Sequence, residues 1–384
     1  MRFADGRVRQ FAPLGRVAGD LPARLTGLTG PWRAASGWIC TGIGASAAVA
    51  DAVADRLRHN GVGAVSLPPG DVPGLAATVG WPVLLVSQSG RSTELLATVE
   101  ALPTGRGLAL TNAADSPLAA ETGEAVVLGG LADSRASTVG FAALLLAGHM
   151  FADWCAGGAP GRGWAAEVAA LSAAAVAFGD RLAGTVMDAA GTATDVTDAA
   201  GTVSDAAGTV SDAAGWAAMD VVADPDWLAA AEYGALMIRE VGRIRAGALE
   251  TRRYLHGPME SAPGGLTVLV GGDRLDRVAD QLAAGPEPAP VLRWSVTISG
   301  GRTTVHVPAS GLPPLLLDSA ALGPFAGQLL VGYGLQEIAQ RVAVARGVDP
   351  DEFVYDQDDT KLGTPSAPAA PPAPLSTIDE RKSN

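Results

Sequence analysis

The sequence predicts an α/β protein, and three observations carry this prediction. Short apolar runs typical of buried strands alternate with helical patterns over residues 37–155. The same alternation returns over residues 217–362. Turns rich in glycine and hydroxyl residues follow several of the strands, as they do at the carboxyl edge of a parallel sheet. We therefore expect two α/β units in tandem, each a three-layer sandwich with a parallel sheet between helices.

The first unit is expected to contain four strands with helices after them. Strands are predicted over 38–40, 82–86, 107–112 and 125–128, and helices over 47–57 and 93–102. Ser116 precedes Pro117, and proline is favoured at the first helical position, so a further helix begins there. Another begins near Ser137 and includes the apolar run 139–151. This run is shorter than the ~20 residues that a membrane span needs, so no membrane segment is expected.

A repetitive segment separates the two units. Gly-Thr-Val-Ser-Asp-Ala-Ala occurs at 201–207 and again at 208–214. Each copy has one apolar valine and one glycine, which is weak material for a coiled-coil seam, so we interpret it as a low-complexity insertion. A partner-binding helix is the alternative. The expected organisation is a helical lead-in (1–36), a first α/β domain (37–155), a helical connector (156–180), the insertion (181–216), a second α/β domain (217–362) and a disordered Pro/Ala tail (363–384).

The second unit is expected to begin with a long helix over 227–249. It continues with a strand and turn at 266–272, a helix at 276–282, strands at 291–298 and 303–307, and a helix at 325–345. The Pro/Ala run that follows cannot form a packed element, so the folded part should end near Leu362.

Composition argues against several functions. The formal net charge of -13 opposes nucleic-acid binding, which needs Lys and Arg to displace counterions. Two cysteines and the lack of a signal-peptide pattern predict a cytoplasmic chain without disulfides. The four histidines have no paired ligand spacing, so neither a metal nor a cofactor is expected. Among 27 Lys and Arg residues, only Lys361 and Lys382 are lysines.

The segment Ser87-Gln88-Ser89-Gly90-Arg91-Ser92 is the most informative motif. It lies between a buried strand and a helix, where free backbone N–H groups and the helix dipole favour an anion. It lacks the Gly-Lys-Ser/Thr ending of a nucleotide P-loop. Helix capping alone is the simpler interpretation, but four hydroxyl residues among the seven at 87–93 exceed what a cap needs.

This segment resembles the sugar-phosphate motif of sugar isomerase (SIS) domains. Gly42-Ile43-Gly44-Ala45-Ser46 is similar to their first glycine-serine turn, and Ala136-Ser137-Thr138 to the segment that opens a later helix. In the second half, residues 235–258 and 335–349 resemble the isomerase portion of glutamine:fructose-6-phosphate amidotransferase. The resemblance implies two tandem SIS domains, each with a five-stranded parallel sheet.

The resemblance also implies roles for individual residues. The residues that would hold a sugar 6-phosphate are Ser46, Ser87, Gln88, Ser89 and Ser92. Ser137 and Thr138 would approach the sugar. Glu240 falls where the family places the base that moves a proton between C1 and C2. His256 falls at the ring-opening acid/base, which a neighbouring subunit lends in the family, so a homodimer with a shared site is expected.

Three departures from the family bear on the activity. The family has a lysine at the position of Met237. Its C-terminal tail carries a lysine that engages the sugar carbonyl, and Lys361 lies about three residues later than that pattern. An amine can form an imine and arginine cannot, but a surface lysine is the alternative. No nucleophilic cysteine follows Met1, so no glutaminase activity is expected.

We therefore expect a phosphosugar isomerase or deaminase that abstracts the C2 proton of a 6-phosphorylated hexosamine, either glucosamine 6-phosphate or an N-acetylated relative. Two alternatives stay open. One is a dehydratase-type elimination on an N-acetylhexosamine 6-phosphate, which begins with the same proton abstraction. The other is a sensor that binds a sugar phosphate without catalysis.

Overall fold

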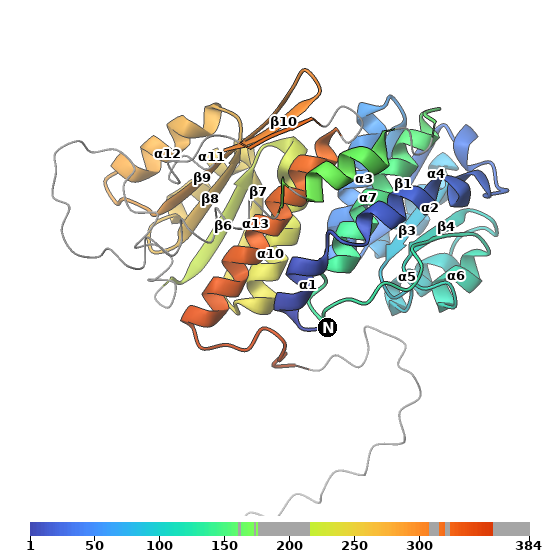
Figure 1. Ribbon diagram of the computed structural model, residues 1–384, viewed down its shortest axis with the longest axis horizontal. Coiled ribbons are helices and arrows are strands. Elements are labelled where there is room, and N and C mark those ends of the chain that lie inside the picture. Colours follow the sequence, from blue (N-terminus) through green and yellow to red (C-terminus); the bar gives the residue numbers. More distant parts are fainter. Residues whose placement is uncertain (160–162, 173, 176–215, 307–314, 319–322, 356–384) are drawn as a thin grey trace, which may run out of the picture.

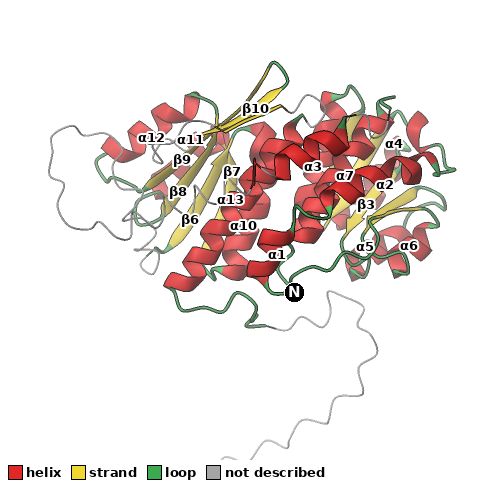
Figure 2. Cartoon of the chain, in the orientation of Figure 1, coloured by secondary structure: helices red, strands yellow, loops and turns green. Residues whose placement is uncertain are grey.

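Two mostly parallel sheets, each flanked by helices, make up the chain, which confirms the predicted α/β class (Figures 1 and 2). This computed structural model describes residues 1–159, 163–172, 174–175, 216–306, 315–318 and 323–355. The predicted insertion apart from Trp216, the Pro/Ala tail and Lys361 lie outside the described residues. The sheets fall within the two predicted α/β ranges, whose domain boundaries stay predictions.

The first sheet is parallel throughout, with the strand order β2-β1-β3-β4-β5. Its strands are β1 (Gly37–Gly42), β2 (Gly63–Ser66), β3 (Val83–Ser87), β4 (Gly107–Thr111) and β5 (Ala125–Val127). The three central strands are buried along their whole length. This burial explains their continuous apolar runs, because helices cover both faces of a parallel sheet.

Four helices of the first half begin within two residues of the predicted starts, at 45, 93, 117 and 139, whereas the helix over 72–79 was not predicted. The helices of this half are α1 (Phe3–Arg9), α2 (Leu14–Thr26), α3 (Ala45–His59), α4 (Val72–Val79), α5 (Thr93–Glu100), α6 (Pro117–Thr122) and α7 (Val139–Cys155). Ser116 caps α6 by accepting the backbone N–H of Ala119 at 3.3 Å, which confirms the predicted start. Helix α7 is buried along almost its whole length. None of the described helices is long and apolar enough to cross a membrane.

The second sheet differs from the five parallel strands that the resemblance implies. Its order is β11-β10-β9-β8-β6-β7, and the pairs β9–β10 and β10–β11 are antiparallel. The strands are β6 (Ala218–Ala223), β7 (Arg245–Glu250), β8 (Leu266–Gly271), β9 (Val291–Ser299), β10 (Arg302–His306) and β11 (Leu315–Asp318). Gly300 and Gly301, with φ of 57° and 77°, reverse the chain as a two-residue hairpin turn requires.

The predicted helix over 227–249 is wrong in its second half. Helix α10 (Leu228–Val241) ends at Gly242, and Arg243 takes a left-handed φ of 51°. The chain then forms β7, which pairs with β6 over six residues. The pairing partner of β7 borders the repetitive insertion and was itself not predicted. Tertiary pairing therefore overrides a local pattern that fits either element.

Helices α10 and α13 (Pro324–Ala345) lie side by side between the two sheets (Figure 1). Their close approach depends on Gly234, where a Cβ atom would overlap Leu335. The other helices of the second half are α11 (Thr251–Leu255) and α12 (Arg274–Ala284). Short 3₁₀ turns occupy η1 (Trp32–Ala34), η2 (Pro69–Asp71), η4 (Pro225–Trp227) and η5 (Pro258–Ser261).

His149 joins the two halves in the core. It lies on α7 with its side chain fully buried, and its Nε2 contacts Gln328 Oε1 of α13 at 2.8 Å. The other ring nitrogen has no hydrogen-bond partner among the described residues. Burial, and to a smaller extent the charge of Arg56, lower the pKa of His149 from 6.5 to about 4. The imidazole is therefore neutral in the folded chain near neutral pH.

We expect His149 to make the fold sensitive to acid. Between pH 6.5 and about 4 the unfolded chain binds a proton that the folded chain refuses, so stability falls as the pH falls through this window. Between about pH 7.5 and about pH 5, the free energy of unfolding in urea should fall by about 2 kcal/mol less for His149→Gln than for the natural chain. His59→Gln, which alters an exposed histidine, is the control. Equal losses in all three proteins would contradict the assignment.

Candidate functional site

The carboxyl edge of the first sheet brings three helix starts together. Strands β1 and β3 turn directly into α3 and α5, and a longer loop leads from β5 to α7. Because the strands are parallel, the positive ends of these helix dipoles and their free N–H groups meet at one edge. This edge can attract an anion without a basic patch.

The turn from β1 into α3 depends on two glycines. A Cβ atom at Gly42 would overlap the backbone of Ser46, and Gly44 has a left-handed φ of 59°. The tight turn places Ser46 in the first turn of α3, with 8% of its surface exposed. The predicted phosphate ligand Ser46 therefore lies at the sheet edge, next to a helix N-terminus.

The segment Ser87–Ser92 forms a loop between β3 and α5. Ser87 Oγ accepts the N–H of Gly90 at 3.0 Å, and Ser89 Oγ accepts the N–H of Arg91 at 3.3 Å. Each hydroxyl keeps its own proton to donate to a ligand. Ser92 stands at the N-cap of α5 without capping it through its side chain. Some hydroxyls of the loop therefore stabilise its own backbone, and the others are available to a ligand.

We expect Gly90→Ala to damage this loop. Gly90 has a φ of 62°, and a Cβ atom there would overlap Ser116, the cap of α6. The strain of a left-handed alanine and the displaced cap should together lower the free energy of unfolding in urea by about 2–3 kcal/mol. Affinity for inorganic phosphate should fall at least about tenfold. Gly105→Ala is the control, since Gly105 has a φ of 76° with nothing within 4 Å. Equal effects at both glycines would contradict the overlap.

Asp133 holds the start of α7, and the sequence reasoning missed it. Its Oδ2 accepts the Ser137 hydroxyl at 2.7 Å, and its Oδ1 accepts the N–H groups of Thr138 at 3.0 Å and Val139 at 2.9 Å. The Thr138 hydroxyl contacts Ser134 Oγ at 2.9 Å. The two residues expected to approach a sugar are thus bonded to their own loop. An aspartate shortly before an apolar helical run was the available signal.

The register of α10 against α3 places Glu240. The two helices run antiparallel, because Leu236 lies 3.7 Å from the position of a Cβ atom at Gly44, just before α3, while Asp226, just before α10, lies 3.5 Å from His59 at the end of α3. Glu240 follows Leu236 by four residues and therefore lies on the same helix face. This register carries the half-buried Glu240 past the start of α3, to the carboxyl edge of the first sheet.

Tyr233 links α10 to the start of α7. Its ring stacks on Phe141 at 3.5 Å between centroids, and its hydroxyl donates to the backbone oxygen of Ser137 at 2.8 Å. Burial raises the pKa of Tyr233 well above its usual value, and the charges of Asp133 and Glu240 add to the rise. The phenol thus stays protonated and fixes the position of α10 at the edge. No sequence motif pointed to it.

The remaining predicted residues are placed differently. Met237, where the family has lysine, is fully buried in the core between the sheets. His256 is exposed at the end of α11, where its backbone N–H donates to Arg253 O at 3.2 Å. Among the contacts described within one chain, none links His256 to the edge that holds Ser46 and the loop Ser87–Ser92.

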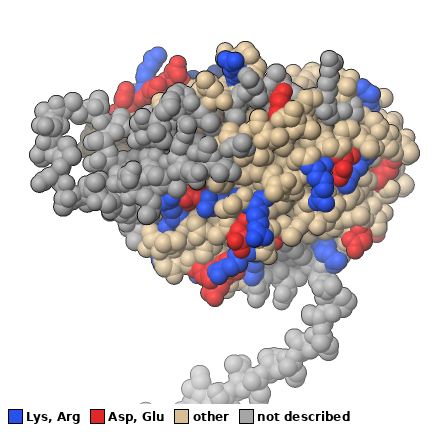
Figure 3. Space-filling model, in the orientation of Figure 1, with Lys and Arg blue, Asp and Glu red and all other residues tan. Residues whose placement is uncertain are grey.

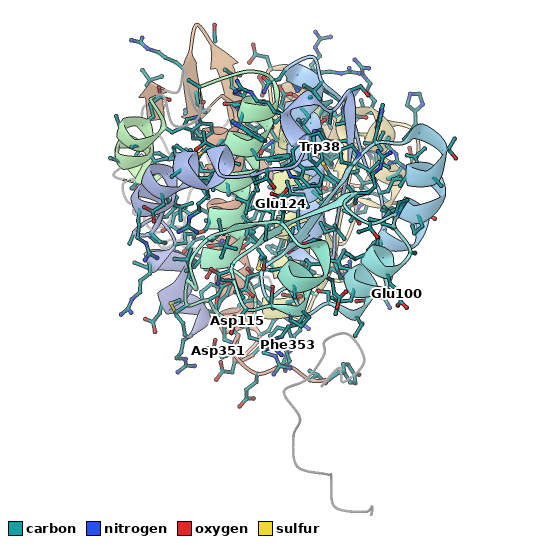
Figure 4. All side chains as sticks on the ribbon, turned by 90° about the vertical axis from the view of Figure 1, so that its right-hand side faces the viewer. Trp38, Glu100, Asp115, Glu124, Asp351 and Phe353 are labelled. Carbon is teal, nitrogen blue, oxygen red and sulfur yellow. The ribbon has the colours of Figure 1, made fainter. Side chains whose placement is uncertain are left out.

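The last described residues run beside the same edge. The Arg135 guanidinium lies 4.3 Å from the centre of the Phe353 ring, and Arg243 donates to the backbone oxygen of Glu352 at 2.5 Å. Arg135 is two residues from Asp133, and Arg243 is three residues from Glu240. Figure 4 shows Phe353 at the end of the molecule that carries Asp115, beyond the carboxyl end of β4.

Charged side chains do not gather by sign on the face shown in Figure 3, where basic and acidic residues are intermixed. Within the described ranges, no group of three or more His, Cys, Asp or Glu side chains is arranged to hold a metal ion. The candidate site therefore consists of hydroxyls, helix N-termini and the carboxylates of Asp133 and Glu240.

No protein-family model matches the chain, and no curated protein matches its sequence. Solved structures do match its fold. Glucosamine-6-phosphate deaminase from Thermotoga maritima superposes with a TM-score of 0.67 and 17% identity, over 93% of this chain and 98% of that one. Tagatose-6-phosphate ketose/aldose isomerase from Escherichia coli gives a TM-score of 0.66 and 16% identity, over 91% and 94%.

The C-terminal domain of glucosamine-fructose-6-phosphate aminotransferase from Francisella tularensis also matches, with a TM-score of 0.64 and 13% identity, over 90% of this chain and 98% of that one. At such identities the likeness establishes the fold alone. The chain therefore has the fold of these phosphosugar enzymes over 90–93% of its length.

Proposed function

We propose that the chain is a phosphosugar isomerase or deaminase that abstracts the C2 proton of a 6-phosphorylated hexosamine. The observation that carries the proposal is the register of α10, which brings a carboxylate from the second half to the helix starts of the first. Aldose–ketose interconversion needs these two parts, an anchor for the phosphate and a base over C2. Solved structures with this fold include a glucosamine-6-phosphate deaminase and a ketose/aldose isomerase, which supports the proposal.

The phosphate is held chiefly by oriented dipoles. Ser46 and the loop Ser87–Ser92, Gln88 included, lie at the N-termini of α3 and α5, whose free backbone N–H groups meet at one edge. A chain of net charge -13 can bind an anion in this way, because the favourable field is local. Ser137 and Thr138 take a supporting role, since they fix Asp133.

Glu240 takes the C2 proton and returns it to C1, and His256 opens the sugar ring. His256 is exposed, as a residue that completes the site of a neighbouring subunit must be. We propose a homodimer in which each chain lends this histidine to its partner. A histidine suits ring opening because its usual pKa lies near neutral pH.

The test is isotope exchange in deuterated water. Purified chain is incubated with glucosamine 6-phosphate, N-acetylglucosamine 6-phosphate and fructose 6-phosphate, and the products are followed by NMR. We expect deuterium at C1 of a ketose product and at C2 of the recovered aldose, and released ammonia if deamination follows. An olefinic or 3-deoxy product would indicate the dehydratase-type elimination instead. If no sugar shows exchange and none gives a product, catalysis on these substrates is excluded.

A sensor without catalysis is the second candidate, and Met237 favours it. The buried methionine leaves the site without the cation that the family has beside the reacting carbonyl, whereas the loop Ser87–Ser92 would bind a phosphate regardless. Phosphosugar binding by calorimetry without any isotope exchange would support the sensor. Binding together with exchange would exclude it.

A further inference from the structure

Asp133 carries a carboxylate whose orientation is fixed by its own loop and helix. Its Oδ1 accepts three backbone N–H groups, those of Ser134 at 2.9 Å, Thr138 at 3.0 Å and Val139 at 2.9 Å. Its Oδ2 accepts only the Ser137 hydroxyl among these groups, at 2.7 Å. A carboxylate oxygen can accept two hydrogen bonds, so Oδ2 keeps capacity for another donor. Asp133 is half-buried.

This carboxylate lies between the phosphate loop and α10. A Cβ atom at Gly140 would lie 2.6 Å from Gln88 Cγ and would overlap Asp133 Oδ2, so these two atoms face the same point. Ser137 links this point to α10, because its hydroxyl donates to Asp133 Oδ2 at 2.7 Å and its backbone oxygen accepts the hydroxyl of Tyr233 at 2.8 Å. A sugar anchored by its phosphate at Gln88 and reaching Glu240 with C2 therefore passes beside Asp133.

The carboxylate also decides what the start of α7 can bind. Its oxygens occupy the free N–H groups that would otherwise attract an anion, so the phosphate is directed to the loop Ser87–Ser92. The remaining lone pair of Oδ2 can accept a donor, and an ammonium donor adds the attraction between opposite charges to the hydrogen bond that a hydroxyl would also form. An acetamido group brings no charge and adds bulk.

We propose that Asp133 is a specificity residue that selects a free ammonium group at C2 of the sugar over a hydroxyl or an acetamido group. The inference rests on the proposed function and deepens it, because it chooses between the amine and its N-acetylated form. Asp133 does not take part in the proton transfer and acts by orienting and discriminating the C2 substituent.

The test compares affinities by calorimetry for glucosamine 6-phosphate, glucose 6-phosphate and N-acetylglucosamine 6-phosphate. We expect the natural chain to prefer the amine about tenfold, and Asp133→Asn to lose this preference while still binding glucose 6-phosphate. Asp224→Asn is the matched control. Asp224 likewise accepts a backbone N–H, from Gly272 at 2.9 Å, and a hydroxyl, from Thr251 at 2.8 Å, but at the edge of the second sheet. It should keep the preference.

A second measurement needs no variant and covers the case in which Asp133→Asn does not fold. In the natural chain, the preference should shrink as the pH rises through the pKa of the sugar amine, which becomes neutral. A preference that is absent, independent of pH, or unchanged in a folded Asp133→Asn would overturn the role of Asp133 alone. Failure of all three phosphosugars to bind would overturn the proposed function together with it.

Discussion

Glu240→Gln is expected to stop isotope exchange at C2 while leaving phosphosugar binding intact. Glutamine keeps the size of the side chain and its place on α10 but cannot accept a proton from carbon. Loss of a positioned general base lowers such rates by about 10²–10⁴-fold, so exchange into glucosamine 6-phosphate should fall to near the background. Calorimetry should show the affinity for the same sugar changed by less than about threefold, because Glu240 is not a phosphate ligand.

Glu232→Gln is the matched control for this experiment. It changes the same residue type on the same helix, two turns earlier, where the side chain is exposed. Glutamine keeps the size of that side chain. Its exchange rate should match that of the natural chain. Exchange that survives in Glu240→Gln would remove Glu240 from the mechanism, and loss of binding in it would point to a structural role.

The fold was predictable where local patterns and packing agree. The apolar runs of β3 and β4 and the proline at the start of α6 identify these elements from sequence alone, because burial and backbone geometry both select those residues. Residues 242–250 show the limit. Ala246, Ala248 and Leu249 satisfy a helical pattern as well as a strand pattern, and only pairing with β6 decides between them. Strand β6, which follows the repeats, has no clear strand pattern of its own in the sequence.

The candidate site was predictable only where a motif is continuous in the chain. The loop Ser87–Ser92 is one such motif, and the structure places it at a helix start as expected. Tyr233 acts through a contact between segments about 100 residues apart, and such contacts leave no local signature. Asp133 bonds residues within six positions of itself, so its place before an apolar helical run was a local signal. The position of Glu240 over this edge depends on the register of two helices from different halves, which spacing in one sequence cannot specify.

Lys361 remains a prediction, and the position of the described C-terminus supports it. Tyr355 is the last described residue, and Phe353 and Glu352 are held by Arg135 and Arg243, each within three residues of the candidate site. An extended segment of six residues spans about 20 Å at most, so the chain length after Tyr355 does not oppose the predicted role of Lys361.

Lys361→Arg should leave no measurable turnover of fructose 6-phosphate or glucosamine 6-phosphate while the affinity for both stays within about threefold. An amine condenses with the ketose carbonyl to an imine and releases water, whereas arginine keeps the charge but cannot form this bond. Borohydride reduction of the natural chain with fructose 6-phosphate should fix the sugar to one peptide. Mass spectrometry should find the adduct on Lys361 and none in Lys361→Arg. Lys382→Arg, which changes the only other lysine, should keep both the turnover and the adduct. Normal turnover in Lys361→Arg, or an adduct on Lys382, would show that the tail lysine is an ordinary surface residue.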